Sequence, residues 1–281
     1  MGIQFKNVSY LYQTSDKTGA LHNINLNIKA QGEFVVILGQ TGSGKSTLVQ
    51  HMNALLQPTS GTVQIFDAIL PAKKRQKINY LRQKVGLVFQ FPEYQLFEEK
   101  IIDDIAFGAK NFKSIAKEAM ARAVNAAKLV GIDETLFNQS PFRISGGQMR
   151  RVAIAGILAM EPEILVLDEP TRGLDPQGKD DIMEVFVKLH ESENKSIVLI
   201  THDMDIVAKY AKRVIVLNQG KLVFDGTKEE LFDHPNFKEF HLDYPTPLKI
   251  LKYLNQKLNL PYKPIYNMEE LVEYLREINY E

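Results

Sequence analysis

Three stretches of the chain are continuously apolar over the length of one strand. They comprise residues 34–38, 164–167 and 197–200, and each is followed by a glycine or a polar residue. Short apolar runs bounded in this way are typical of strands that are buried on both faces of a sheet. The chain is therefore expected to contain a buried sheet whose strands end in glycine or polar residues.

Other segments alternate apolar and polar residues, as strands with one solvated face do. The segments assigned to strands by this pattern or by their apolar content are 4–10, 21–28, 61–66 and 85–89. We expect the first two to lie beside the strand at 34–38. Near the end of this region, residues 214–217 and 221–224 predict a hairpin that turns at Asn218-Gln219-Gly220.

Helical spacing of apolar residues fills the gaps between these strands. Residues 101–142 show this spacing and predict a helical insert, and further helices are expected at 149–158 and 178–191. Because strands and helices alternate along the chain, the first part is predicted to be an α/β domain ending near Pro235.

The pattern changes after Pro235. Residues 243–247 contain two prolines and are expected to act as a linker. Beyond them, leucines recur at helical spacing over 248–258, and a second amphipathic segment covers 268–278. Two short helices with an apolar face either pack on the core or form an oligomerisation module, and the sequence leaves both possibilities open.

Composition narrows the classes of function. The chain has 281 residues, 34 basic and 34 acidic, so no net charge draws it to nucleic acid or to anionic lipid. A basic tract at 73–77 is explained by a solvated surface, and no nucleic-acid partner is expected. With no cysteine, disulfides and thiolate metal sites are excluded. No apolar run reaches about 18 residues, and no signal peptide is recognisable, so membrane contact is expected only through partners.

The strand at 34–38 runs directly into a glycine-rich turn and a helix. The turn fits the pattern G-x-x-x-x-G-K-[ST], in which backbone N–H groups surround phosphate oxygens. Lys45 would reach the outer phosphates, and the hydroxyl of Ser46 would ligate Mg²⁺. The residues predicted to bind the phosphates of ATP are Gly39, Gln40, Thr41, Gly42, Ser43, Gly44, Lys45, Ser46 and Thr47.

Acidic residues and a histidine end the other two apolar strands. Asp168 and Glu169 follow the strand at 164–167, where phosphate-loop ATPases hold Mg²⁺ and orient the attacking water. His202 follows the strand at 197–200 and could donate a hydrogen bond to the γ-phosphate. Alternatively, the two acids could simply lie on the surface, and the histidine could make a hydrogen bond with only a structural role. The phosphate loop upstream favours the functional interpretation.

Each of three further sequence features has two possible interpretations. Gln90 lies in a loop with four aromatic residues, 89–97, which is either buried or binds a partner. The helix at 149–158 is preceded by Ser145-Gly146-Gly147-Gln148, which forms either an anion site or a simple N-cap. Tyr12 could stack on a purine, or it could cap the core at the end of a strand.

Taken in order, these motifs resemble those of the ATPases of ABC transporters, over about residues 3–235. The resemblance makes Gly39 to Thr47 the Walker A loop, Gln90 the Q-loop residue that senses Mg²⁺, and 145–148 the signature. It makes Asp168 the Walker B aspartate that holds Mg²⁺, Glu169 the catalytic glutamate, Asp175 the D-loop residue and His202 the switch histidine. It also puts Tyr12 where the family stacks an aromatic on adenine.

The resemblance also implies a fold. It is a phosphate-loop NTPase core with a mixed α/β sheet and helices, an antiparallel β subdomain and a helical subdomain, plus a small helical C-terminal extension. In this sequence the nucleotide-binding domain would cover 1–235, with its helical subdomain at about 100–158. The extension would cover 236–281 and could serve as a dimerisation module. In the family the serine of one subunit's signature closes on ATP held by the other subunit's phosphate loop, so hydrolysis reopens the pair.

A narrower resemblance is to energy-coupling factor (ECF) transporters, and within them to the second of two paralogous ATPase subunits. It rests on residues 89–98, on the helix sequence 145–158 and on the size of the extension. It implies a heterodimer with the paralogous ATPase, a transmembrane coupling protein (T component) and a substrate-binding membrane protein (S component). Such a complex imports vitamins or other micronutrients, with this subunit peripheral on the cytoplasmic face of the cell membrane.

Two departures from the family pattern stand out. Ile144 replaces the usual leucine before the signature, a substitution that conserves volume. Arg172 stands where a small residue is common, which puts the family's contacts across the dimer in question at this position.

Alternative functions are the ATPase of another ABC importer and an ATP-gated structural subunit that does not hydrolyse ATP. The intact Glu169 and His202 argue against the second. A chromosome-organising ATPase would need a long coiled coil, and 101–142 is too short for one.

Overall fold

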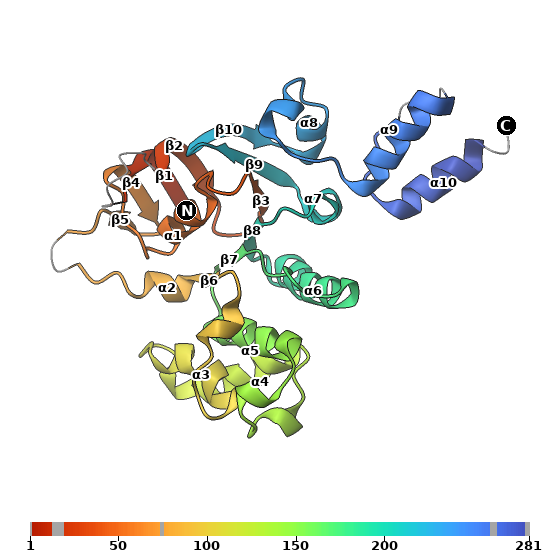
Figure 1. Ribbon diagram of the computed structural model, residues 1–281. Helices are drawn as coiled ribbons and strands as arrows, with labels where there is room; N and C mark the ends of the chain where they lie inside the picture. Colours follow the sequence, from red (N-terminus) through yellow and green to blue (C-terminus); the bar gives the residue numbers. More distant parts are fainter. Residues whose placement is uncertain (1, 13–19, 74–75, 259–262, 279–281) are drawn as a thin grey trace.

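The computed structural model describes residues 2–12, 20–73, 76–258 and 263–278. It contains a six-stranded mixed sheet at the centre of the molecule and a four-stranded antiparallel sheet beside it (Figure 1). The central sheet runs in the order β10 (Lys221–Gly226), β9 (Arg213–Asn218), β3 (Phe34–Leu38), β8 (Ser196–Ile200), β7 (Ile164–Asp168) and β6 (Val85–Val88). All its neighbouring strands are parallel except β9 and β10, which form the expected hairpin.

The second sheet corrects one expectation. Its strands run in the order β2 (Leu21–Ile28), β1 (Ile3–Tyr10), β4 (Ser60–Ile65) and β5 (Ala68–Leu70). The prediction that the first two strands lie beside β3 is wrong, because β8 and β9 occupy both edges of β3. The physical reason is that alternating strands have one apolar face and suit an antiparallel sheet with one solvated side, whereas β3 is buried throughout.

β3 lies between two hydrophobic cores. Phe34, Val36 and Leu38 face a cluster that includes the helical subdomain, whereas Val35 and Ile37 face a cluster shared with the antiparallel sheet. Helix α1 (Lys45–Met52) contributes Leu48, Val49 and Met52 to the second cluster. The phosphate loop, which joins β3 to α1, is therefore anchored at both ends by packed elements.

The helical subdomain forms the lower part of the molecule in Figure 1. Its helices are α3 (Ile101–Lys110), α4 (Ala119–Leu129) and α5 (Gly146–Leu158), with short turns η1 (Pro92–Gln95), η2 (Ala116–Glu118), η3 (Glu134–Leu136) and η4 (Pro141–Arg143). A one-turn helix α2 (Leu81–Lys84) precedes β6, and the long α6 (Pro176–Glu193) packs on the central sheet. The mixture of sheets and helices confirms the expected fold class.

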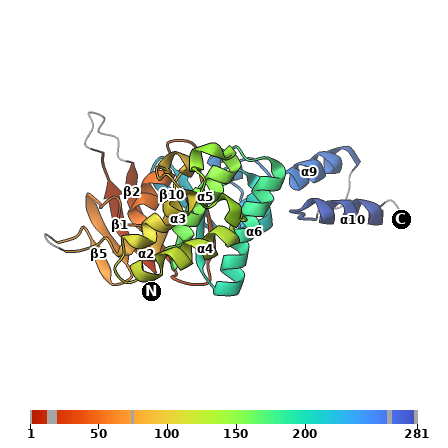
Figure 2. The same ribbon diagram turned by 90° about the horizontal axis from the view of Figure 1, so that it is seen from below.

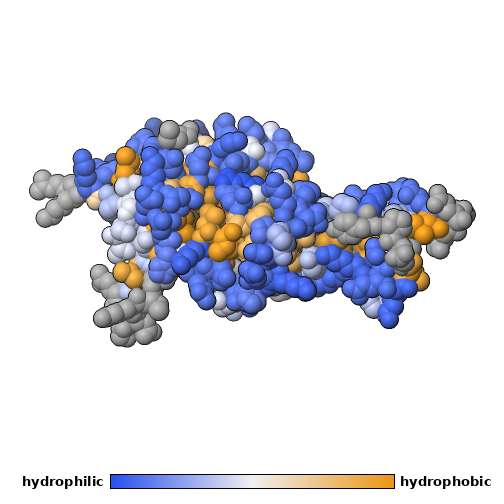
Figure 3. All heavy atoms as spheres, turned by 90° about the horizontal axis from the view of Figure 1, so that it is seen from above, coloured by the Kyte–Doolittle hydropathy of each residue, from blue (hydrophilic) through white to orange (hydrophobic). Residues whose placement is uncertain are grey.

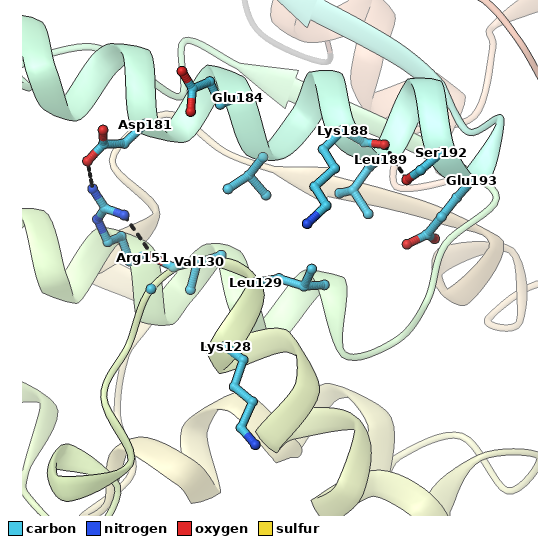
Figure 4. Close-up of a pocket in the computed structure, with 12 residues that line it drawn as sticks. Lys128, Leu129, Val130, Arg151, Asp181, Glu184, Lys188, Leu189, Ser192 and Glu193 are labelled. Atoms are coloured by element: carbon cyan, nitrogen blue, oxygen red, sulfur yellow. Dashed lines mark hydrogen bonds and ion pairs between the residues drawn. The ribbon is translucent and has the colours of Figure 1, made fainter.

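One arginine connects the helical subdomain to α6. Arg151 on α5 donates to the carbonyl of Val130 at the end of α4 (2.9 Å) and to the carboxylate of Asp181 on α6 (2.8 Å) (Figure 4). These contacts border a cavity of about 310 Å³ between the α4–α5 side and α6. Its lining holds acidic and basic residues together and none of the predicted site residues.

The C-terminal part is helical, as expected. Beyond residue 235 it contains η5 (Phe237–Phe240), α9 (Thr246–Leu258) and α10 (Met268–Ile278), while the short helices α7 (Met204–Tyr210) and α8 (Lys228–Phe232) precede it, on either side of the β9–β10 hairpin. Phe237, Phe240 and Leu248 belong to the hydrophobic cluster that also contains Phe34 and Val36, so packing against the domain continues past residue 235. Helix α9 already begins within residues 243–247, the stretch expected to be a linker. The distal parts of α9 and α10 pack on each other and project from the body of the molecule (Figures 1 and 2).

This projecting pair leaves apolar side chains in solvent. In Figure 3 hydrophobic residues show along the arm on the right. The exposed apolar side chains of α9 and α10 include Leu258, Met268 and Val272. None of the helices in the described parts of the chain is both long and apolar enough to cross a bilayer. Of the basic tract, Lys74 and Arg75 lie outside the described residues.

Candidate nucleotide site

The phosphate loop leaves β3 in a conformation that needs glycine. Gly39, Gly42 and Gly44 have φ angles of 143°, 80° and 101°. A Cβ on Gly44 would lie 2.5 Å from the carbonyl oxygen of Ala20, whereas one on Gly42 would meet nothing within 4 Å. Gly44 is thus required for packing of the loop, while Gly42 faces open space in which the backbone can approach a ligand.

The ammonium group of Lys45 lies over the loop. Its Nζ donates to the carbonyl oxygens of Gly39 (2.7 Å) and Gln40 (2.8 Å). Burial lowers the pKa of Lys45, and the nearby carboxylates of Glu169 and Asp168 oppose that shift. Ser43 has a buried hydroxyl without a partner among the described residues. The loop therefore contains a cation bonded only to neutral carbonyls and an unused polar group, which suits a site for an anion.

The proposed Mg²⁺ ligands are adjacent. Ser46 donates from Oγ to Oδ2 of Asp168 at 3.0 Å. Burial raises the pKa of the Asp168 carboxyl and the charge of Glu169 raises it further, while the hydrogen bond from Ser46 and the charge of Lys45 lower it. A buried carboxylate beside a hydroxyl offers the hard oxygen ligands that Mg²⁺ prefers.

No group of three or more His, Cys, Asp or Glu residues that could hold a metal occurs among the described residues. This agrees with the way Mg²⁺ binds in nucleotide sites, where one or two protein oxygens are supplemented by phosphate and water. Ser46 and Asp168 therefore fit Mg²⁺ bound together with a nucleotide, and do not form a closed protein cage for a metal.

Glu169 lies at the centre of the polar cluster. Its carboxylate is 3.2 Å from Nδ1 of His202, and it accepts from Nε2 of Gln90 (3.2 Å) and from Nη1 of Arg172 (3.1 Å). Gln90, Glu169 and His202 follow the adjacent strands β6, β7 and β8, whose carboxyl ends meet at one edge of the sheet. Glu169 also has a φ of 50°, an unfavourable conformation for a residue with a Cβ, as is common where function fixes the backbone.

Two cavities, of about 350 and 440 Å³, lie against the loop. Both are lined by Thr41, Lys45, Glu169 and Arg172. Tyr12 lines the first cavity and is 44% exposed, so it does not cap the core, and its hydroxyl is 3.0 Å from Oγ1 of Thr47. An aromatic ring at this place lies within reach of a ligand whose phosphates occupy the loop.

The signature and Asp175 are not part of either cavity. Ser145 caps α5, where its side chain accepts from the backbone N–H of Gln148 and the Gln148 side chain accepts from the N–H of Ser145. Asp175 caps α6 by accepting from the N–H of Gly178 at 3.3 Å. Within one chain these residues therefore stabilise helix ends and do not line the cavities of the phosphate loop.

Several residues near the site were not found by sequence reasoning. Arg172 was noted only as a departure from the family, yet it lines both cavities and pairs with Glu169, three residues earlier in the same turn. The second cavity is also lined by His241, Leu242 and Asp243, which come from the C-terminal part. No motif or periodicity marks those three, because only the path of the chain after η5 brings them there.

Comparison with known proteins agrees with this geometry. A family model described as ABC transporter matches residues 21–172. Over 284 aligned residues the chain is 46% identical to the energy-coupling factor transporter ATP-binding protein EcfA2 of Bacillus cereus, covering 99% of this chain and 96% of that protein. It is 52% identical to the protein of the same name from Lactiplantibacillus plantarum over 244 residues, covering 86% of this chain and 82% of the other.

Solved structures give the same result. CbiO1 from Clostridium perfringens, described as part of the ABC transporter complex cbiONQ, is 38% identical with a TM-score of 0.73, over 92% of this chain and 95% of CbiO1. The ATP-binding cassette MJ0796, solved as a dimer in a post-hydrolysis state with ADP and Pi, is 33% identical with a TM-score of 0.72, over 80% of this chain and 98% of that one. The chain belongs to the ABC transporter family, among the energy-coupling factor transporter ATP-binding proteins.

Proposed function

We propose that this chain is the ATP-binding and ATP-hydrolysing subunit of an energy-coupling factor importer. The observation that carries the proposal is the position of Glu169. Its carboxylate lies at the same sheet edge as the phosphate loop, beside the Ser46–Asp168 pair and in contact with His202. A loop for phosphates, oxygen ligands for Mg²⁺ and a carboxylate for water are the parts that phosphoryl transfer to water requires.

The residues of this chain would have distinct roles in binding and hydrolysing ATP. Backbone N–H groups of 39–46 would bind phosphate oxygens, and Lys45 would exchange its two carbonyl partners for the outer phosphates. Ser46 and Asp168 would hold Mg²⁺, with Gln90 beside them, and when bound the ion neutralises charge on the phosphates. Glu169 would orient and polarise the attacking water, and His202 would donate to the γ-phosphate.

The signature would complete the site in a dimer. Ser145 to Gln148 form the N-terminus of the 13-residue helix α5, where the first N–H groups and the helix dipole favour an anion, yet they do not line the cavities at the phosphate loop of their own chain. A second ATPase subunit could supply the same helix end to the ATP bound here, with Asp175 near the contact. Loss of the γ-phosphate after hydrolysis would then weaken the contact between the subunits.

The partners follow from the same reading. We propose that the second ATPase is a paralogue and that the pair works with a T component and an S component at the cytoplasmic face of the membrane, importing a vitamin or other micronutrient. Exposed aromatic side chains on the helical subdomain support a membrane partner. They are Tyr94, Phe97, Phe107 and Phe142, with exposures of 84%, 57%, 41% and 62%, and the rings of Phe97 and Phe107 lie 4.8 Å apart. Large aromatic side chains left in solvent are typical of interaction surfaces.

The test is ATP hydrolysis by the complex carrying Glu169→Gln. We expect the variant to bind ATP as the parent does and to lose about 10²–10⁴-fold in turnover, the contribution that a positioned general base makes. Steady-state phosphate release measures turnover, and ATP affinity is measured separately by calorimetry. Glu191→Gln, at an exposed position of α6, is the matched control and should hydrolyse as the parent. A Glu169→Gln complex that hydrolyses at the parent rate would contradict the assignment.

A further inference from the structure

Arg172 makes three contacts that join the catalytic glutamate to the aromatic loop. Its Nη1 donates to Oε2 of Glu169 at 3.1 Å, and its guanidinium carbon lies 5.4 Å from the ring centroid of Phe91. Its backbone carbonyl accepts a hydrogen bond from the guanidinium of Arg150 on α5. One residue of the turn after β7 therefore contacts the loop that follows β6, the helix that carries the signature and Glu169 itself.

The loop of Phe91 and Glu93, Arg150 on α5 and Arg172 are linked to one another by contacts. Phe91 has a φ of 55° and is the N-cap of the turn η1, and Glu93 in that turn pairs with Arg150 through two bonds of 3.1 and 2.7 Å. Arg150 is 4% exposed, so its position is fixed by burial. Arg172 is held by the same arginine through its carbonyl. A shift of 91–95 would therefore displace the ring on which the Arg172 guanidinium rests.

The contact with Arg172 also occupies an oxygen of the Glu169 carboxylate. Oε2 of Glu169 accepts from both Gln90 and Arg172, while Oε1 faces His202. A carboxylate that orients water must direct an oxygen at the water, and both oxygens are engaged here. Gln90 and His202 follow the ends of β6 and β8, so the strands fix their backbones, while the His202 side chain is 72% exposed. Arg172 lies farther along the turn after β7 and is followed by Gly173 at a φ of 75° with open space around it, so it can leave without moving the sheet.

An incidental surface pair is the alternative, because the Arg172 side chain is 48% exposed. Two observations oppose it. Arg172 lines both cavities of the phosphate loop together with Lys45 and Glu169, and its guanidinium lies over an aromatic face as well as beside a carboxylate. A planar guanidinium can donate from its edge to a carboxylate while its face lies over an aromatic ring.

We propose that Arg172 is a positioning residue that restrains the carboxylate of Glu169 until the Phe91 segment moves. This inference rests on the proposed function, since a restraint on Glu169 affects turnover only if Glu169 orients water. Breaking a half-exposed ion pair is worth about two- to fivefold in an equilibrium, so the restraint should slow hydrolysis by a factor of that size. It should leave ATP affinity unchanged, because Arg172 already has its partners within the protein.

The experiment compares Arg172→Gln with Arg172→Lys in the full chain, alone and in its complex. Arg172→Gln should raise kcat about two- to fivefold with KM for ATP within about twofold of the parent. Arg172→Lys keeps the charge and should stay within about twofold in kcat. Arg82→Gln, an exposed arginine of α2, is the matched control and should behave as the parent. The backbone bond to Arg150 survives in every variant, which favours folding.

Three kinetic results would overturn the inference. They are a kcat of Arg172→Gln at or below the parent value, a change confined to KM, which would make Arg172 a nucleotide-binding residue, and an Arg172→Lys variant that matches Arg172→Gln. Hydrogen exchange without nucleotide gives a readout independent of turnover. Amides of 91–97 should exchange faster in Arg172→Gln than in the parent, and equal exchange would also contradict the restraint. If the parent complex fails to hydrolyse ATP, the proposed function fails, while the exchange measurement still decides on the restraint.

Discussion

Replacing Glu93 by glutamine removes one charge of a largely buried ion pair. The Glu93 and Arg150 side chains are 14% and 5% exposed, and they meet through two hydrogen bonds of 3.1 and 2.7 Å. Glutamine keeps the shape and one acceptor oxygen but places an amide N–H₂ against N–H donors. The guanidinium of Arg150 would then be a buried charge whose partners are the Arg172 carbonyl, the Phe91 ring and a neutral oxygen, with no carboxylate.

The size of the effect follows from that burial. Breaking a buried pair by removing one partner costs about 3–5 kcal/mol, whereas a surface pair is worth about 1 kcal/mol or less. With a urea slope of about 3 kcal/mol/M, a loss of this size lowers the unfolding midpoint by about 1–1.7 M. We therefore expect Glu93→Gln to destabilise the subunit by about 3–5 kcal/mol.

Equilibrium urea unfolding followed by circular dichroism is the appropriate assay, because the chain has no tryptophan to report by fluorescence. Glu99→Gln, the same substitution at an exposed position of the same loop, is the control and should shift the midpoint little. A loss of less than about 1 kcal/mol in Glu93→Gln would refute the reasoning, since it would mean that Arg150 finds water or another partner.

Two further predictions concern a buried acid and the C-terminal helices. Burial raises the pKa of Asp104, whose carboxylate accepts from the amides of Phe97 and Glu98. Because the pKa of Asp104 is higher in the folded protein than the ordinary 3.8, the charged carboxylate destabilises the fold at pH values above the folded pKa. This destabilisation disappears as the pH falls through the folded pKa toward 3.8, below which the carboxyl is protonated in both states. In urea unfolding, Asp104→Asn should therefore gain stability relative to the parent at pH 8 and lose that gain at low pH; a gain independent of pH would contradict this. Asp205→Ala removes two bonds to Thr246, of 2.6 and 2.7 Å, and should cost about 1–2 kcal/mol of protection against hydrogen exchange in α9, whereas unchanged protection would show that α9 is held elsewhere.

The phosphate loop was predictable because its signals are local. The apolar run 34–38, the glycines and Lys45 are contiguous, so one segment of sequence determines strand, turn and helix. Glu169 and His202 were predictable for a related reason. Glu169 directly follows β7 and His202 lies two residues beyond β8, and the carboxyl ends of parallel neighbours meet at one edge of the sheet.

The partners of those residues were harder to predict. Alternation in β1 and β2 shows that one face is buried but does not show which strand lies alongside, so the expected neighbour β3 was wrong. Arg172 and Phe91 are far apart in the sequence, and nothing in their local patterns marks a contact. Such pairs depend on the relative positions of the loops after β6 and β7, which are set by the packing of α5.

The central claim is that ATP bound at Lys45 is enclosed by the signature helix of a second subunit. Sedimentation of the Glu169→Gln chain with its paralogue tests it directly, because this variant should hold ATP without consuming it. We predict a more compact ATPase dimer with ATP and Mg²⁺ than with ADP, and loss of this difference when Ser145 is replaced by arginine. Unchanged sedimentation on ATP binding, or a change that persists in Ser145→Arg, would contradict the claim.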